Sequence, residues 1–308
     1  MKISSFLGNS SLMMLTAIIV VLTVGGFPHG FPIPIGDISM ISLILMMTLS
    51  LSSIEIKGMK ISHYKTDIRN AFILSFVLLT AVTLAMAYFF TGDLRSGWIL
   101  EAAVPSAVSV ISFTCLWGGD TESSAVSSVA IYLLSLFITP IITLLFLGKA
   151  VSEVTLLAYV GLQIVIPLLF SRVVKRFLTS ANIRNILINI CFFILVIAVA
   201  GENRGMLFSA GAIVGIIVAF ALARTFGVGI ICNRLLLKSG VKPKSTVSAT
   251  LFSTYKNTGM AASLALVLLG PLAALPAAAC MIAEVFWLIF AGKFLFPKEH
   301  AIGIAAPK

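Results

Sequence analysis

Long apolar runs separated by short polar loops follow one another along this chain. Each run holds about 17 residues or more, enough for a helix to cross the hydrocarbon core of a bilayer, whereas β-barrel strands would show short alternating segments. We therefore predict an all-α integral membrane protein whose first helix is retained. The ten predicted spans are residues 11–27, 35–54, 70–90, 97–117, 122–147, 152–172, 183–200, 206–232, 246–269 and 271–296.

Composition supports this prediction and excludes a soluble protein. Of the 308 residues, 59% are hydrophobic and only 10% are charged, and the mean hydropathy is +1.12. A soluble protein of this length would need far more charge to cover its surface. The formal net charge of +10 could suggest a nucleic-acid partner. Because the basic residues lie between the apolar runs, we expect the lipid bilayer as a partner and no nucleic acid.

The distribution of Lys and Arg orients the predicted spans. With ten spans, 16 basic residues fall on one side of the membrane and 3 on the other. Under the positive-inside rule, both termini would be cytoplasmic, in a multi-pass protein of the cell's plasma membrane. The larger set is Lys2, Lys57, Lys60, Lys65, Arg69, Arg172, Lys175, Arg176, Arg184, Arg234, Lys238, Lys242, Lys244, Lys293, Lys298 and Lys308; the smaller set is Arg95, Lys149 and Arg204.

Two basic residues remain inside the apolar runs. Arg224 lies toward the cytoplasmic end of the eighth span, so we expect its side chain to snorkel to the interface. Lys256 lies about ten residues or more from either end of the ninth span, too deep to snorkel easily. An ionisable residue at that depth predicts a functional site.

The ten spans divide into two sets of five, residues 1–148 and 149–308. Because each set has an odd number of spans, the second would enter the membrane from the opposite side, giving an inverted repeat. In transporters of this design, substrate and ion sites form where interrupted helices of the two halves meet near the midplane. Spans four and nine are the matching positions, so both should be interrupted.

Both of these spans carry a candidate interruption. Pro105 in span four removes a backbone donor and disfavours helix at Val104, which frees carbonyl groups within the bilayer. Free backbone groups at that depth are tolerated only where they line a cavity or bind something. In span nine, residues 254–258 form the polar run Thr-Tyr-Lys-Asn-Thr. A simple proline kink is the alternative for span four taken alone.

An intramembrane enzyme is the main alternative from another class. The Gly-Gly-Asp at 118–120 is loosely similar to a motif of intramembrane aspartyl proteases, which need a second membrane aspartate. Asp37, Asp67 and Asp93 lie at span ends or in loops, so we predict no enzyme. The histidines are scattered and the cysteines lack metal-ligand spacing, so we expect no cofactor. A channel or a non-transporting membrane sensor is a further alternative.

Residues 105–120, PSAVSVISFTCLWGGD, and residues 252–261, FSTYKNTGMA, resemble motifs of the bile acid:sodium symporter family, within a wider group that includes arsenite efflux carriers. Span four of that family carries a pattern like P-G-G-x-x-S-N that ends in G-D or G-N, and residues 105–120, PSAVSVISFTCLWGGD, keep its sixteen-residue spacing. Span nine of the family carries E-x-G-x-Q-N-S-G-L-A. Residues 252–261, FSTYKNTGMA, align with it through Asn257, Gly259 and Ala261.

The departures from this pattern fall on the family's two sodium sites. Its Ser-Asn pair of span four becomes Val110-Ile111, its Glu of span nine becomes Phe252, and its Gln becomes Lys256. Only the span-five hydroxyls remain, as Ser124 and Ser128. An ammonium about 4 Å from a second monovalent cation costs about 4 kcal/mol at an effective dielectric constant of about 20, roughly a thousandfold in affinity. The resemblance implies a transporter, and the substitutions argue against coupling to two sodium ions.

Three roles are open for the ammonium group of Lys256. It could replace a sodium ion at the crossover, it could titrate and make the carrier proton-coupled, or it could bind a substrate carboxylate. Glu284, at a comparable depth in span ten, is the expected protein partner, and an ion pair between the two is the structural alternative. Glu101, early in span four, lies nearer the outer surface and is a weaker candidate.

The resemblance implies a secondary transporter that moves a small organic anion by alternating access, with spans one, two, six and seven as a panel and the other six as a core. The anion would be a keto acid, a pantoate-like acid or an amphipathic steroid-like acid; a sodium-coupled symporter with altered ligands is the alternative. Nothing in the sequence indicates an oligomeric state. The expected binding residues are Pro105, Ser106, Ser109, Thr114, Ser124, Ser128, Thr254, Tyr255, Lys256, Asn257, Thr258 and Glu284.

Overall fold

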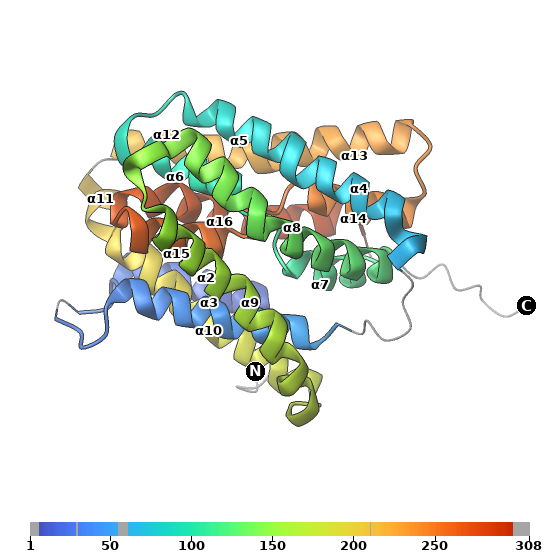
Figure 1. Cartoon of the computed structure of the whole chain (residues 1–308), viewed down its shortest axis with the longest axis horizontal. Helices are drawn as coiled ribbons and strands as arrows, with labels where there is room; N and C mark the ends of the chain where they lie inside the picture. Colours follow the sequence, from blue (N-terminus) through green and yellow to red (C-terminus); the bar gives the residue numbers. More distant parts are fainter. Residues whose placement is uncertain (1–5, 29, 55–60, 210, 298–308) are drawn as a thin grey trace, which may run out of the picture.

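The computed structural model describes residues 6–28, 30–54, 61–209 and 211–297, and its regular elements are all helices (Figure 1). No β-strand occurs in these residues; a single isolated bridge joins Ser106 to Lys256. Five residues that contribute to the predicted orientation lie outside the described residues: Lys2, Lys57, Lys60, Lys298 and Lys308. An all-helical chain is what long apolar runs require, because in lipid a helix satisfies its backbone groups within one segment.

Seven helical stretches are long and apolar enough to cross a membrane, which indicates a multi-pass membrane protein. Four are single helices: α3 (Ile35–Ser52), α8 (Thr121–Leu147), α9 (Glu153–Phe177) and α10 (Ala181–Glu202). The other three stretches include short π-helical segments. They consist of η1 (Ile61–Tyr64), α4 (Lys65–Phe72), η2 (Ile73–Leu79) and α5 (Thr80–Ala87); of α12 (Gly211–Leu222), η4 (Ala223–Gly227) and α13 (Val228–Lys238); and of α16 (Pro271–Phe290) and η5 (Ala291–Leu295).

The remaining three predicted spans are shorter or broken. Span one is α2 (Ser10–Thr23), of 14 residues. Span four is divided into α6 (Gly92–Ala103) and α7 (Ser109–Leu116), and span nine into α14 (Pro243–Phe252) and α15 (Thr258–Leu268). Both predicted interruptions are therefore present, at 104–108 and 253–257. The short helices η3 (Gly148–Ala150) and α11 (Arg204–Ser209) lie between longer ones.

Four helices form one group that lies along the rest of the molecule. Helix α3 packs against α9 and α10, and α10 packs against α2. Figure 1 shows these four helices in the lower part of the view, with α4, α5, α8 and α12 to α16 largely above them. The group contains the same helices as the predicted panel, spans one, two, six and seven.

Helices α6 and α16 approach each other so closely that one position accepts no side chain. A Cβ atom built on Gly97 would collide with the backbone carbonyl of Ala273 and lie 3.1 Å from Cδ of Pro276. Backbone atoms cannot yield as a flexible side chain can, so glycine is required here. This contact holds together two helices that carry buried carboxylates, Glu101 on α6 and Glu284 on α16.

We predict that Gly97→Ala lowers the melting temperature of the purified protein, because a methyl group at this position forces α6 away from α16. Overpacking of this kind costs typically about 1–3 kcal/mol. Gly161→Ala is the matched control, because a Cβ on this α9 residue would meet no atom within 4 Å. The melting temperatures of both variants in detergent test the prediction, which fails if they are equal.

Candidate functional site

The two interrupted segments meet in the interior and bond to each other. The backbone N–H of Asn257 donates to the carbonyl oxygen of Pro105 (2.7 Å), and the N–H of Ala107 donates to that of Tyr255 (3.4 Å). Ser106 and Lys256 thereby form an isolated antiparallel bridge. Each unwound segment supplies partners for backbone groups that the other leaves free, as a buried backbone requires.

The last carbonyl groups of α6 obtain partners from three other elements. Pro105 has no N–H, and the chain beyond it is not helical, so these oxygens have no partner within the helix. The oxygen of Ala102 accepts from the hydroxyl of Thr80 at 2.9 Å, and that of Ala103 from the hydroxyl of Thr139 at 2.9 Å. The end of α6 is thus satisfied by side chains of α5, α8 and the second interrupted segment.

The second interrupted segment contributes the ammonium group of Lys256. Its Nζ donates to the carbonyl oxygens of Ala102 (2.9 Å) and Val104 (2.8 Å) and to the hydroxyl oxygen of Thr80 (2.9 Å). An ammonium group has three N–H donors, and all three are used. The side chain is fully buried, and Nζ lies 4.9 Å from the centre of the Phe76 ring. In this conformation Lys256 is a cationic cap on the negative end of a half-helix.

The structure does not show the alternative of an ion pair between Lys256 and Glu284. The hydrogen bond between these two residues comes from the backbone N–H of Lys256, which donates to Oε1 of Glu284 at 3.3 Å. The ammonium points instead toward the carbonyl groups that Pro105 leaves free. The sequence carried the two relevant signals separately, a proline in span four and a lysine in span nine, but not the direction of the lysine side chain.

Glu284 pairs with Arg224, which does not snorkel to the interface. Arg224 is fully buried; its Nη1 donates to Oε1 of Glu101, and its Nη2 donates to Oε1 of Glu284 at 2.7 Å. Glu101 is also fully buried inside the protein. A buried charge persists only when it is paired, so two inward carboxylates hold this guanidinium inside. Sequence reasoning missed this cluster, although three ionisable residues in spans four, eight and ten were a usable signal.

A cavity of about 330 Å³ borders the crossing point. Its wall includes the beginnings of the half-helices α7 and α15, at Ser109 and Thr258, and one carboxylate, Glu284. The panel side contributes residues of α2, α3 and α10, among them Asn185 and Asn189. The cavity therefore lies between the group of α2, α3 and α10 and the helices that carry the interruptions.

The ends of α7 and α15 that border this cavity favour an anion. Helix N-termini carry a partial positive charge. Asn257 caps α15 by accepting the N–H of Met260 on Oδ1 (3.1 Å), while its Nδ2 donates to the hydroxyl of Tyr132 (2.9 Å). The convergence of two N-termini on one cavity gives it a positive character that apolar residues alone would not.

Half of the predicted site residues line this cavity, namely Ser109, Tyr255, Lys256, Asn257, Thr258 and Glu284; the other half, Pro105, Ser106, Thr114, Ser124, Ser128 and Thr254, do not. Ser124 donates to the hydroxyl of Thr114 at 3.0 Å, and Thr254 donates to the carbonyl oxygen of Thr250 in the preceding helix α14. Among the described residues, no hydrogen-bond partner is found for the buried hydroxyls of Ser106 and Ser128. Tyr255 and Asn257 do line the cavity, and the hydroxyl of Tyr255 donates to the carbonyl oxygen of Glu284 at 3.1 Å. Sequence reasoning did not identify Thr80, Thr139 or Tyr132 as partners of the site.

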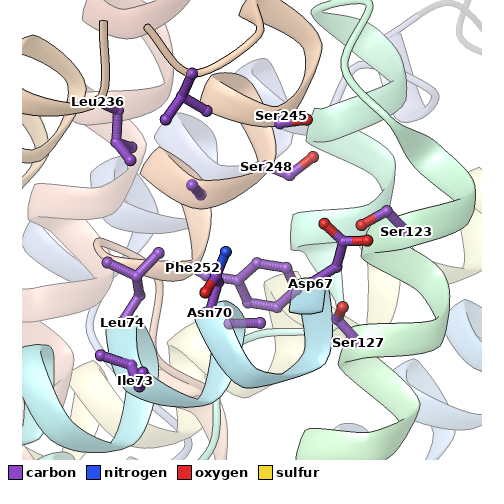
Figure 2. A pocket seen from close by; sticks show the side chains of 13 residues that line it. Asp67, Asn70, Ile73, Leu74, Ser123, Ser127, Leu236, Ser245, Ser248 and Phe252 are labelled. Carbon is purple, nitrogen blue, oxygen red and sulfur yellow. The ribbon is translucent and has the colours of Figure 1, made fainter. Parts of the chain in front are cut away.

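A second cavity, of about 270 Å³, lies between α4, α8, α13 and α14 (Figure 2). Its wall carries one carboxylate, Asp67, and hydroxyl groups of Ser123, Ser127, Ser245 and Ser248. None of the predicted site residues lines it, and no residue of either interrupted segment reaches it. We therefore place the candidate site at the first cavity.

No protein-family model matches this chain, and no curated protein matches it in sequence.

We predict that Lys256→Met destabilises the protein, because it leaves the buried carbonyl group of Val104 without this partner and removes one of the two donors to Ala102. A buried polar group left unsatisfied costs about 1–3 kcal/mol. Lys238→Met, at an exposed position of α13, is the control for loss of one lysine. Thermal unfolding in detergent compares the two variants; equal stability would show that the ammonium is not a structural cap.

We predict that Arg224→Gln costs about 3–5 kcal/mol, because it leaves two carboxylates buried without their cation. The triple variant Arg224→Gln, Glu101→Gln and Glu284→Gln should recover much of that loss, since it removes all three charges together. Arg234→Gln, at an exposed position, controls for loss of an arginine. Unfolding temperatures of the set provide the test, and a triple variant no more stable than the single one contradicts the pairing.

Proposed function

We propose that this chain is a secondary active transporter that moves a small organic anion across a membrane by alternating access. The observation that carries the proposal is the crossing of two interrupted helices, from matching places in the chain, beside a cavity. Irregular backbone at membrane depth is tolerated where it is buried in protein or lines a binding cavity, and transporters use it for their sites.

The proposal includes the finer architecture: ten spans in two inverted five-helix repeats, residues 1–148 and 149–308, with spans one, two, six and seven as a panel. It also includes relationship to the bile acid:sodium symporter family. Support comes from the two interruptions in spans four and nine, and from the packing of α2, α3, α9 and α10 as one group. A cavity between that group and the interrupted helices is where rocking of two bodies would expose a substrate.

The predicted orientation in the membrane indicates the side toward which the cavity opens. The cavity wall includes Ser10 at the beginning of α2, Ser50 near the end of α3 and Asn185 near the beginning of α10. These are the ends that the predicted orientation places at the cytoplasmic side. The conformation is therefore proposed to be inward-facing, with the cavity open toward the cytoplasm.

An anion is the preferred cargo because two helix N-termini meet at the cavity. The apolar part of the wall, which includes Met14, Met47, Ile188 and Phe192, suits the hydrocarbon part of an organic acid. Keto acids, pantoate-like acids and steroid-like acids remain the candidate classes. In this conformation the ammonium of Lys256 is not the group that binds their carboxylate, because its three donors are already used.

The hydrogen bonds of the Lys256 ammonium also support sodium-independent transport. The ammonium of Lys256 supplies a fixed positive charge beside the crossing point, and a sodium ion at short range from it would be repelled. A sodium-coupled symporter with altered ligands is the alternative. Of the two span-five hydroxyls expected to remain from the sodium sites, Ser124 donates to Thr114, and no partner is found for Ser128 among the described residues.

We predict that the protein in proteoliposomes shows saturable counterflow of an organic acid at equal rates with sodium and with potassium as the cation. A thermal-stabilisation screen of pantoate, pyruvate and cholate, run with and without sodium, selects the acid to label. Counterflow separates a carrier from a channel, a sensor or an enzyme. Strong dependence of binding or uptake on sodium favours the sodium-coupled alternative, and absence of counterflow by every acid contradicts the proposed function.

A further inference from the structure

Glu284 is placed differently from the other buried carboxylate of the charge cluster. Glu284 is 7% exposed and lines the cavity, whereas Glu101 is 0% exposed and does not. Both accept a hydrogen bond from Arg224. The second oxygen of Glu284, Oε2, has one hydrogen-bond contact among the described residues, the hydroxyl of Thr258 at the long distance of 3.5 Å. Oε2 of this cavity-lining carboxylate is thus only weakly hydrogen-bonded.

The charges of the cluster balance without a bound solute. When all four groups are ionised, Arg224 and Lys256 carry two positive charges and Glu101 and Glu284 carry two negative charges, all in the interior. An organic anion that enters the cavity adds one negative charge next to the carboxylate of Glu284. Two like charges at short range in a poorly solvated site repel strongly. A proton on Glu284 removes this repulsion and restores the balance.

We propose that Glu284 takes up one proton each time an organic anion binds, so that the carrier moves the anion and the proton together. The inference rests on the proposed function and adds its coupling ion. Binding converts the carboxylate of Glu284 to a carboxylic acid with a proton from the aqueous phase, and release of the anion returns that proton to the aqueous phase. Oε1 keeps its hydrogen bonds from Arg224 and from the N–H of Lys256, and Oε2 carries the proton toward Thr258 or the anion.

The neighbours of Glu284 allow this change of charge. The groups around it are Arg224 of η4, Glu101 of α6, and the N–H of Lys256 and the side chain of Tyr255 in the interrupted segment. Cys280 lies one turn earlier on α16, near Arg224 and both carboxylates. The parts of α2, α3 and α10 that line the cavity present only Ser, Asn, Met, Ile and Phe side chains. Arg224 retains Glu101 as an ionised partner when Glu284 is neutral.

Lys256 is a poorer proton carrier than Glu284 because of its bonds. Its ammonium donates to Thr80, to the carbonyl oxygen of Ala102 at the end of α6 and to that of Val104 in the interrupted segment. Loss of a proton would leave two N–H donors for these three acceptors and remove the positive charge from the end of the half-helix. The two roles are therefore divided, with Lys256 as the fixed cation and Glu284 as the group that gains and loses a proton.

Binding of pantoate, pyruvate and cholate to the purified wild-type protein, measured between pH 5.5 and about 8.5, tests the proposal. For the acid that binds, the dissociation constant should rise about tenfold per pH unit where Glu284 is ionised in the free protein. Glu284→Gln, which keeps an acceptor for Arg224 but takes no proton, should bind with little dependence on pH. Glu101→Gln removes the same charge from Arg224 but not from the cavity wall, so it should keep the wild-type slope.

Proton uptake by the wild-type protein gives a measurement that needs no variant. Adding the acid to the protein in weakly buffered solution should consume about one proton per bound anion, read as a rise in pH. In proteoliposomes, an inward proton gradient should drive accumulation by the wild type, and Glu284→Gln should lose this accumulation. Binding or counterflow without proton uptake overturns the role of Glu284 and leaves the proposed function standing. If none of the three acids binds or exchanges, both fall.

Discussion

The structure depends on the hydrogen bonds made to the carbonyl groups at the end of α6, a helix that ends inside the protein. Pro105 ends α6 and leaves carbonyl groups at a depth where water is not available to bond them. The ammonium of Lys256 supplies two of the required bonds, and hydroxyls of Thr80 and Thr139 supply two more. Because these donors come from three other elements, the end of α6 fixes where α5, α8 and the second interrupted segment must lie.

This arrangement also explains why so many ionisable groups are tolerated in one place. A lone lysine in the interior would be unstable, but here it caps the negative end of a half-helix. Arg224 adds a second cation and is held by two carboxylates, so the cluster is neutral as a whole. Glycine at position 97 lets α6 and α16 approach closely enough for both carboxylates to reach the same guanidinium.

The sequence predicts the elements better than it predicts the partners of their side chains. Hydropathy located nearly all the long helices, and Pro105 and the polar run at 254–258 located both interruptions, because these depend on local chemistry. The partners of Lys256 and Arg224 depend on rotamers and on helices distant in the chain. Thr80 gave no signal, since a threonine in an apolar helix is ordinary. Arg224 was misplaced because its position near a span end allowed an outward side chain equally well.

The covalent attachment of the cation constrains any mechanism at this site. A bound ion that dissociates on one side of a membrane can transfer the energy of its gradient to a solute, but the ammonium of Lys256 cannot leave the protein. It can stabilise the crossing point, yet as a fixed cation it transfers no energy from an ion gradient to the transported solute. A carrier built around it must therefore either exchange solutes without coupling or use a different ion at a different group. Glu284 is a group of that kind, because it borders the cavity, carries the opposite charge and belongs to the same balanced cluster.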